Sequence, residues 1–208
     1  MHKLLSSIEK LKKSHVKDLV EARLKEFREI GDSSSSEIFK ELCFCILTAH
    51  SNAERCIRVQ TEIGDGFLTL PEPQLEARLT ELGHRYPSAR ARYIVLARNH
   101  ADSMKDIIQT FNDENSLREW LATNIKGLGF KEASHFLRNV GFTDLAILDF
   151  HIMDILERNN IVQQKRGLTK KRYLEIEKGL KEIAEETDLN LAQLDLYLWY
   201  LETGKILK

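Results

Sequence analysis

A chain of 208 residues is long enough for one large domain or for two small domains that pack closely together. Hydrophobic residues make up 42% of the sequence and charged residues 30%, a composition that excludes a disordered polypeptide. The 31 basic and 32 acidic residues give a net charge of −1, so the total charge does not by itself indicate a nucleic-acid partner. No apolar run approaches the roughly 18 residues that a membrane-spanning helix needs, so we expect no membrane partner.

The cysteines indicate the compartment. Cys43 and Cys45 lie in an uninterrupted apolar run, and the three cysteines of the chain cannot all be paired in disulfides. Buried free thiols are typical of a reducing compartment, so we expect a cytoplasmic protein.

Hydrophobic residues recur at three- and four-residue steps along most of the chain, which predicts helices almost throughout. The first such pattern consists of the apolar residues Val16, Leu19, Val20, Leu24 and Phe27. A polar break follows at residues 33–36. Residues 37–49 are then nearly all apolar, which predicts a helix buried at the centre of the fold.

Prolines mark the starts of later helices. Pro71 and Pro87 each stand where a helix is expected to begin. Residues 145–148 form a short apolar run with no obvious partner strand, so we expect an extended buried segment there. Leucines at helical spacing over residues 191–201 predict the last helix. The predicted fold class is therefore all-α.

The triplet Gly127-Leu128-Gly129 interrupts two helical patterns. Glycine at both positions permits a positive φ and a sharp reversal of the chain. The helix expected to begin near Phe130 would present free backbone N–H groups at its positive end, and such groups suit a DNA phosphate. An ordinary tight turn between packed helices explains the same glycines without any ligand.

Lys131 and Asp149 are the candidate reactive residues. A lysine at a helix N-terminus is unexpected, because the helix dipole there disfavours positive charge; the same field helps to hold an amine neutral and nucleophilic. Asp149 lies 18 residues further on, directly after the extended apolar run. It could be the N-cap of the next helix or a carboxylate beside a developing positive charge.

The stretch from Ile125 to Ile152 resembles the helix-hairpin-helix DNA glycosylase superfamily. The whole chain resembles the archaeal-type branch of the 8-oxoguanine DNA glycosylase/AP lyases, the second subfamily of these enzymes. Further segments that match this branch are residues 39–49, 83–86, 194–200 and 204–208.

The resemblance implies a single helix-hairpin-helix unit over residues 1–208, with two helical subdomains and a DNA cleft between them. The hairpin motif would span about residues 119–141, and the C-terminal helices, residues 149–208, would complete the cleft. The implied partner is double-stranded DNA that contains 8-oxoguanine, bound by a monomer associated with the nucleoid.

The resemblance also implies the chemistry. Lys131 would attack C1′ of a flipped 8-oxoguanine nucleotide and expel the base. The resulting Schiff base would permit β-elimination, which nicks the strand 3′ to the lesion. Asp149 would stabilise the cationic sugar and help to set the protonation of Lys131. The family requires no metal and no redox cofactor for these steps.

Other site residues follow from the same resemblance. Tyr86 and Trp199 would stack on the two faces of the flipped base, although core packing also explains a tryptophan in an apolar helix. The last residue, Lys208, would distinguish 8-oxoguanine from guanine. The expected contacts to the DNA backbone are Gly127, Gly129 and His151.

Three alternatives remain open from the sequence. One is a related helix-hairpin-helix glycosylase for another damaged base, such as an endonuclease III-like pyrimidine glycosylase or a mismatch adenine glycosylase. Many of those carry a four-cysteine iron–sulfur loop near the C-terminus, whereas no cysteine follows Cys56 in this chain. The others are a non-enzymatic helix-hairpin-helix module that grips the DNA backbone and a helical protein scaffold.

Overall fold

The computed structural model describes residues 2–163 and 168–208. Every regular element in those residues is a helix, so the predicted all-α class is confirmed for them. The elements are α1 (His2–Lys12), α2 (Val16–Asp32), α3 (Ser35–Thr48), α4 (Ala53–Ile63), α5 (Gly66–Thr69), α6 (Glu72–Glu81), α7 (Pro87–Ala97), the 3-10 helix η1 (Arg98–His100), α8 (Met104–Thr110), α9 (Glu114–Asn124), α10 (Phe130–Asn139), α11 (Phe150–Arg158), α12 (Lys170–Glu186) and α13 (Leu191–Thr203).

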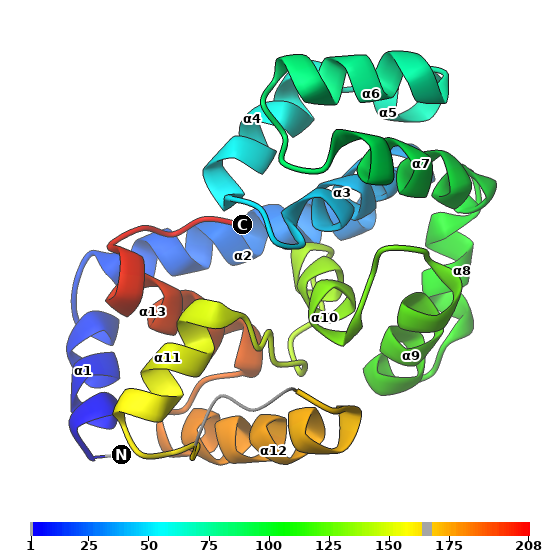
Figure 1. The fold of residues 1–208 in the computed structure, drawn as a ribbon. Coiled ribbons are helices and arrows are strands. Elements are labelled where there is room, and N and C mark those ends of the chain that lie inside the picture. The colour runs from blue at the N-terminus through cyan, green and yellow to red at the C-terminus, as the bar shows by residue number, and fades with distance from the viewer. Residues whose placement is uncertain (1, 164–167) are drawn as a thin grey trace.

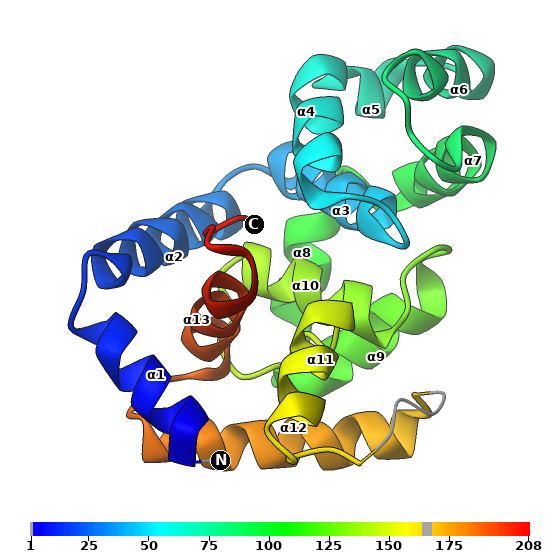
Figure 2. The same ribbon diagram turned by 60° about the vertical axis from the view of Figure 1, so that its left-hand side comes forward.

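Two groups of helices enclose separate apolar cores (Figures 1 and 2). Helices α3 to α10 surround the larger core, whose buried apolar residues lie between Ile38 and Leu145. The other group joins the two ends of the chain, because α1 shares a core with α11, α12 and α13, and α2 packs against α13. The expected two helical subdomains are confirmed, and the N-terminal helices belong with the C-terminal ones.

The predicted central helix is α3. Between residues 38 and 48, only Lys40 is not buried. Ser34 begins the helix as its N-cap and accepts the backbone N–H of Glu37 at 3.3 Å. This local chemistry agrees with the polar break seen in the sequence.

The predicted inner face of α2 is confirmed except at one position. Val16, Val20, Leu24 and Phe27 are buried, whereas Leu19 is 45% exposed. These four buried residues form a narrow stripe with helical spacing, and Leu19 lies beside it. The stripe alone is enough to pack α2 against α13.

A close approach of two backbones joins the two groups. A Cβ atom on Gly31 of α2 would lie 2.1 Å from the carbonyl oxygen of Val140, directly after α10. Only glycine therefore permits α2 to pack this closely on the end of α10. Within the described residues, no helix combines the length and apolar character needed to cross a bilayer.

Candidate active site

A cavity of about 700 Å³ is lined by both groups of helices. The larger group contributes α10 and the α3–α4 connection, and the smaller group contributes residues 147–151, α13 and the chain end. The sequence-predicted site residues that the fold brings to this cavity are Lys131, Asp149, His151, Trp199 and Lys208.

Lys131 lies in the first turn of α10, as predicted, and a neighbouring carboxylate holds it there. Oε1 of Glu132 is 3.0 Å from Nζ of Lys131, and Oε2 accepts the backbone N–H of Gly129 at 3.2 Å. Burial raises the pKa of Glu132, but the Lys131 ammonium and the hydrogen bonds outweigh it and lower that pKa below its usual value. The amine therefore sits beside a carboxylate that remains ionised.

Asp149 is the N-cap of α11. Its carboxylate accepts the backbone N–H of Ile152 at 2.9 Å, so the predicted capping role is confirmed. Burial raises the pKa of Asp149, and the Ile152 N–H and the charge of Lys131 oppose that rise. The same side chain lines the cavity, so capping does not remove it from the site.

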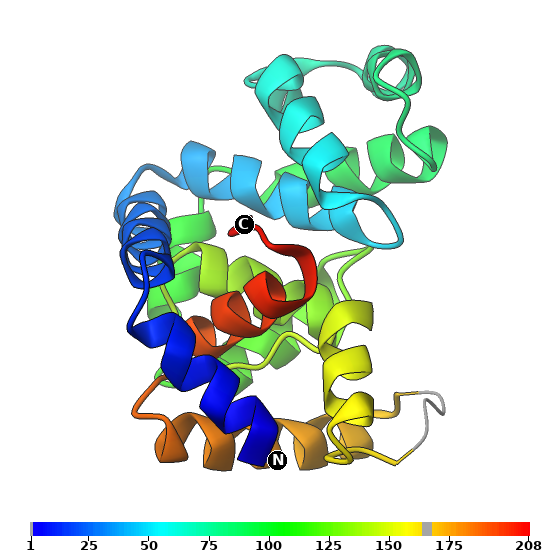
Figure 3. The same ribbon diagram turned by 90° about the vertical axis from the view of Figure 1, so that its left-hand side faces the viewer.

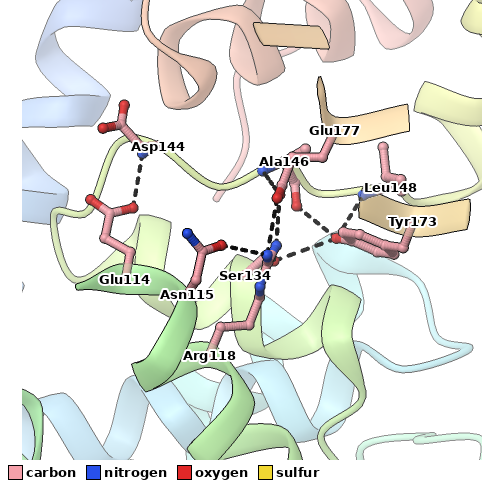
Figure 4. A network of polar contacts seen from close by, with 9 residues as sticks. All are labelled: Glu114, Asn115, Arg118, Ser134, Asp144, Ala146, Leu148, Tyr173 and Glu177. Carbon is pink, nitrogen blue, oxygen red and sulfur yellow. Dashed lines mark hydrogen bonds and ion pairs between the residues drawn. The ribbon is translucent and has the colours of Figure 1, made fainter. Parts of the chain in front are cut away.

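The segment that leads into α11 is extended, buried and without a partner strand, as predicted. Side chains of α12 satisfy its backbone instead (Figure 4). Glu177 accepts the N–H of Ala146 at 2.8 Å. The hydroxyl of Tyr173 donates to the carbonyl of Ala146 at 2.6 Å and accepts the N–H of Leu148 at 3.3 Å. These bonds determine where the next residue, Asp149, enters the cavity.

Glu177 is held in turn by Arg118 of α9. The two side chains form a bidentate ion pair at 2.6 and 2.9 Å, and both are buried (Figure 4). The guanidinium of Arg118 also lies 4.5 Å from the ring centre of Phe130, the first residue of α10. One ion pair therefore contacts both the start of the helix that carries Lys131 and the segment that carries Asp149.

The two hairpin glycines have different conformations. Gly127 has a φ of +96°, as predicted, and a Cβ atom there would lie 2.6 Å from the ring of Tyr93. Gly129 has a φ of −92° and a ψ of −172°, so the prediction of a positive φ at this position is wrong. Gly129 is the N-cap of α10, and an N-cap residue adopts extended backbone. Neither glycine lines the cavity.

The chain end folds back from α13 toward α3 (Figure 3). Nζ of Lys208 is 2.7 Å from Oε2 of Glu41 and 4.5 Å from the ring centre of Phe44. Glu41 is buried and also accepts hydrogen bonds from Asn139 and Gln60, at 2.6 and 3.1 Å. Because the ammonium of Lys208 is engaged with α3, the side chain serves as an anchor for the chain end.

Of the two aromatic residues predicted to hold a base, the cavity lining includes Trp199 alone. Trp199 lines the cavity, and its ring centre is 4.7 Å from that of His151, with the rings at 80°. Tyr86 does not line this cavity. It precedes α7 as the N-cap, is 38% exposed and lies beside the guanidinium of Arg85.

The polar residues of the cavity wall that sequence reasoning missed include Glu132, His135, Arg138 and Asp195. Arg138 and Asp195 form a buried ion pair between α10 and α13. Burial raises the pKa of Asp195 to about 6, opposed by Arg138 and reinforced by the negative charge of Asp149. An aspartate between Leu194 and Leu196, in an apolar helix, was the available signal.

The cysteines are free and buried, as predicted. Burial raises the pKa of Cys43 and of Cys45, so both thiols stay protonated. In the part of the chain that the structure describes, no three histidine, cysteine, aspartate or glutamate side chains are grouped to hold a metal ion.

Comparison with solved structures identifies the class. The structure of an endonuclease III–DNA complex matches with a TM-score of 0.57 at 16% identity and covers 88% of this chain and 85% of that chain. A likeness at this identity shows the fold alone. The chain therefore has the helix-hairpin-helix fold of that enzyme, and its α9–α10 hairpin carries Lys131.

Closer relatives identify the family. The family profile described as 8-oxoguanine DNA glycosylase matches residues 20–189. A protein of Methanocaldococcus jannaschii named 8-oxoguanine DNA glycosylase/AP lyase is 54% identical over 206 residues, 99% of each chain. The crystal structure of the M. jannaschii protein with a 15mer DNA containing 8-oxoguanine gives a TM-score of 0.97 at 53% identity and covers 99% of this chain and all of that one. The crystal structure of the 8-oxoguanine DNA glycosylase of Thermotoga maritima gives a TM-score of 0.94 at 44% identity and covers 100% of this chain and 99% of that chain. The chain belongs to the 8-oxoguanine DNA glycosylase family.

The contacts of Tyr173 generate a prediction. Tyr173→Phe removes the hydroxyl and leaves Ala146 and Leu148 with unpartnered buried backbone groups. We expect the free energy of unfolding, measured in urea, to fall by about 1–3 kcal/mol. The amide of Leu148 should exchange faster in hydrogen-exchange NMR. Tyr197→Phe is the control, because Tyr197 is equally buried but lies in another core. Unchanged exchange at Leu148 would contradict the prediction.

Proposed function

We propose that this chain flips 8-oxoguanine out of duplex DNA, excises it and nicks the strand 3′ to the abasic site. The observation that carries the proposal is that Lys131 and Asp149 meet in one cavity, in a chain that is 54% identical over 206 residues to an 8-oxoguanine DNA glycosylase/AP lyase. An amine with a neighbouring proton acceptor is what a covalent glycosylase mechanism needs.

Lys131 is the proposed nucleophile. Its neutral amine attacks C1′ of the flipped nucleotide; the C1′–N9 bond breaks, and the bonding electron pair leaves with the base, which takes up a proton. The attached nitrogen loses a proton and the sugar ring opens, which gives an iminium between Nζ and C1′. Loss of a C2′ proton and departure of the 3′ phosphate complete the β-elimination.

Asp149 is the proposed electrostatic and proton-transfer partner. Its carboxylate stabilises positive charge on the sugar while the C1′–N9 bond breaks. The raised pKa of Asp149 makes it a better proton acceptor than an ordinary aspartate, so it suits removal of a proton from Lys131.

Base recognition is proposed for Trp199 and Lys208. The indole stacks on the flipped base, and the main-chain end of Lys208 accepts the N7–H that 8-oxoguanine has and guanine lacks. The anchor from Lys208 to Glu41 supports this assignment, because it leaves the chain end itself at the cavity. Tyr86 is proposed to cover the other face of the base, and its neighbour Arg85 lines the cavity.

The proposed backbone contacts are Gly127, Gly129 and His151. The N–H groups at the start of α10 suit a phosphate, and His151 lies on the cavity wall. We propose action as a monomer, because a single chain supplies both Lys131 and Asp149 to the cavity. The buried free thiols support a cytoplasmic location.

Lys131→Gln tests the nucleophile. The substitution keeps a hydrogen-bonding side chain and removes the amine, so we expect loss of both base excision and strand nicking while damaged DNA still binds. Lys126→Gln removes the same charge from an exposed hairpin lysine and should keep both activities. A borohydride-trapped complex formed by the Lys131 variant would show that another amine is the nucleophile.

Asp149→Asn separates capping from chemistry. Asparagine caps helices about as well as aspartate, so the melting temperature should change little. We expect the single-turnover excision rate to fall by about 10²–10⁴-fold, the range of a lost proton-transfer group. Asp113→Asn is the matched control, because Asp113 caps α9 through the N–H of Ser116 at 2.9 Å. Near-normal turnover at position 149 would reject the catalytic role.

Deletion of Lys208 tests base recognition. We expect excision of 8-oxoguanine to fall far more than cleavage at a preformed abasic site, which has no base to read. A C-terminal tag that occupies the chain end should have a similar effect. Equal losses on both substrates would assign Lys208 to folding of the chain end.

A further inference from the structure

Glu132 is the carboxylate that touches the reactive nitrogen. Its Oε1 lies 3.0 Å from Nζ of Lys131, and its Oε2 holds the N–H of Gly129. The side chain of Glu132 is 13% exposed, and that of Lys131 is 25% exposed. Because one oxygen caps α10, the carboxylate cannot turn away from Lys131 without losing the cap.

We propose that Glu132 is a further catalytic residue, the counter-ion that stabilises positive charge on the Lys131 nitrogen in both the resting ammonium and the iminium joined to DNA. The proposal rests on the proposed function of Lys131 as nucleophile. It gives Glu132 a role distinct from that of Asp149.

The charge on the nitrogen changes twice during the proposed reaction. It is positive at rest, neutral when it attacks C1′ and positive again in the iminium. The N-terminal end of α10 disfavours both positive states, because the helix dipole points its positive end at this turn. A fixed carboxylate at 3.0 Å opposes that field, so it favours the two cationic states and disfavours the neutral one.

Other charged or titratable groups also face this nitrogen or its neighbours. Those that line the same cavity are Asp149 before α11, His151 on α11, His135 and Arg138 on α10, Asp195 on α13, Lys208 and Lys205 at the chain end, His50 in the α3–α4 connection, Glu54 and Arg55 on α4, and Arg85 before α7. Of the acidic side chains that line this cavity, Asp195 is already paired with Arg138 and Glu54 with Lys205, whereas Glu132 contacts Lys131 itself.

The two carboxylates that act on Lys131 suit different tasks. The pKa of Asp149 is raised by burial, whereas that of Glu132 is lowered by Lys131 and its hydrogen bonds despite burial. The group with the raised pKa accepts a proton more readily, and the other keeps its charge. Asp149 therefore takes the proton, and Glu132 remains the counter-ion.

Glu132→Gln tests the proposal without removing the cap, because glutamine at this position also accepts the N-cap N–H. Loss of the negative charge makes the ammonium easier to deprotonate. We expect the rising limb of the single-turnover excision rate against pH to move down by about one pH unit, so that the variant excises up to about tenfold faster than wild type on that limb. The amount of borohydride-trapped complex per excised base should fall, because the iminium loses its counter-ion.

The control is Glu119→Gln on α9, which makes the same change in net charge. Glu119 pairs with Lys170 at 2.7 Å on the exposed surface. This variant should match wild type in both measurements. Melting temperatures of both variants check that α10 remains folded.

Glu132→Ala gives a second, independent measurement. It removes the carboxylate and opens space beside the amine, so added formate should restore borohydride trapping in this variant and leave wild type unchanged. A merely structural role for Glu132 predicts no such rescue.

A pH–rate profile and a trapping yield for Glu132→Gln that superimpose on wild type would overturn the proposal and leave Glu132 as a cap alone. Absence of formate rescue in Glu132→Ala would also count against it. Failure of the proposed function would be distinguished by two other results. Wild-type protein would excise no 8-oxoguanine, or the Lys131→Gln variant would still form a borohydride-trapped complex with DNA.

Discussion

The buried ion pair between Arg118 and Glu177 holds the reactive residues together. Removing two charges from water is costly, and close ion pairing with additional hydrogen bonds offsets that cost. Here Glu177 also accepts the N–H of Ala146 at 2.8 Å, and Arg118 also donates to Asn115 at 2.8 Å. The pair thereby replaces the missing strand partner of the segment that ends at Asp149. Without it, that segment would bury unpaired backbone groups, which structures avoid.

A second polar network anchors the other side of the cavity. Arg138 pairs with Asp195, and the adjacent Asn139 donates to Glu41, which holds the ammonium of Lys208. This chain of contacts runs from α13 through α10 to α3 and back to the last residue. A chain terminus usually frays, and this one is held because its side chain completes a buried carboxylate's hydrogen bonds.

The cavity places one amine under the influence of two carboxylates with opposite pKa shifts. Asp149 is partly buried at the cap of α11, and desolvation dominates its pKa. Glu132 is also partly buried, yet its contact with Lys131 and its hydrogen bonds, including that from the N–H of Gly129, lower its pKa. The opposite pKa shifts arise from the ionic and hydrogen-bond partners of the two side chains and not from their chemical type, because both groups are carboxylates at helix N-termini. This environment suits proton transfer at one carboxylate and charge stabilisation at the other.

The sequence by itself determined the helices, the burial of α3, the place of Lys131 in the first turn of α10 and the cap at Asp149. These features depend on periodicity and capping between near neighbours, which a sequence displays directly. Tertiary structure alone decided that the N-terminal helices share a core with the C-terminal ones, that Gly129 is extended and that Tyr86 lies off the cavity. It also decided that Arg118 meets Glu177 across 59 positions and that Lys208 meets Glu41 across 167. Such pairs leave no local pattern, because what brings them together is the packing of helices far apart in the chain.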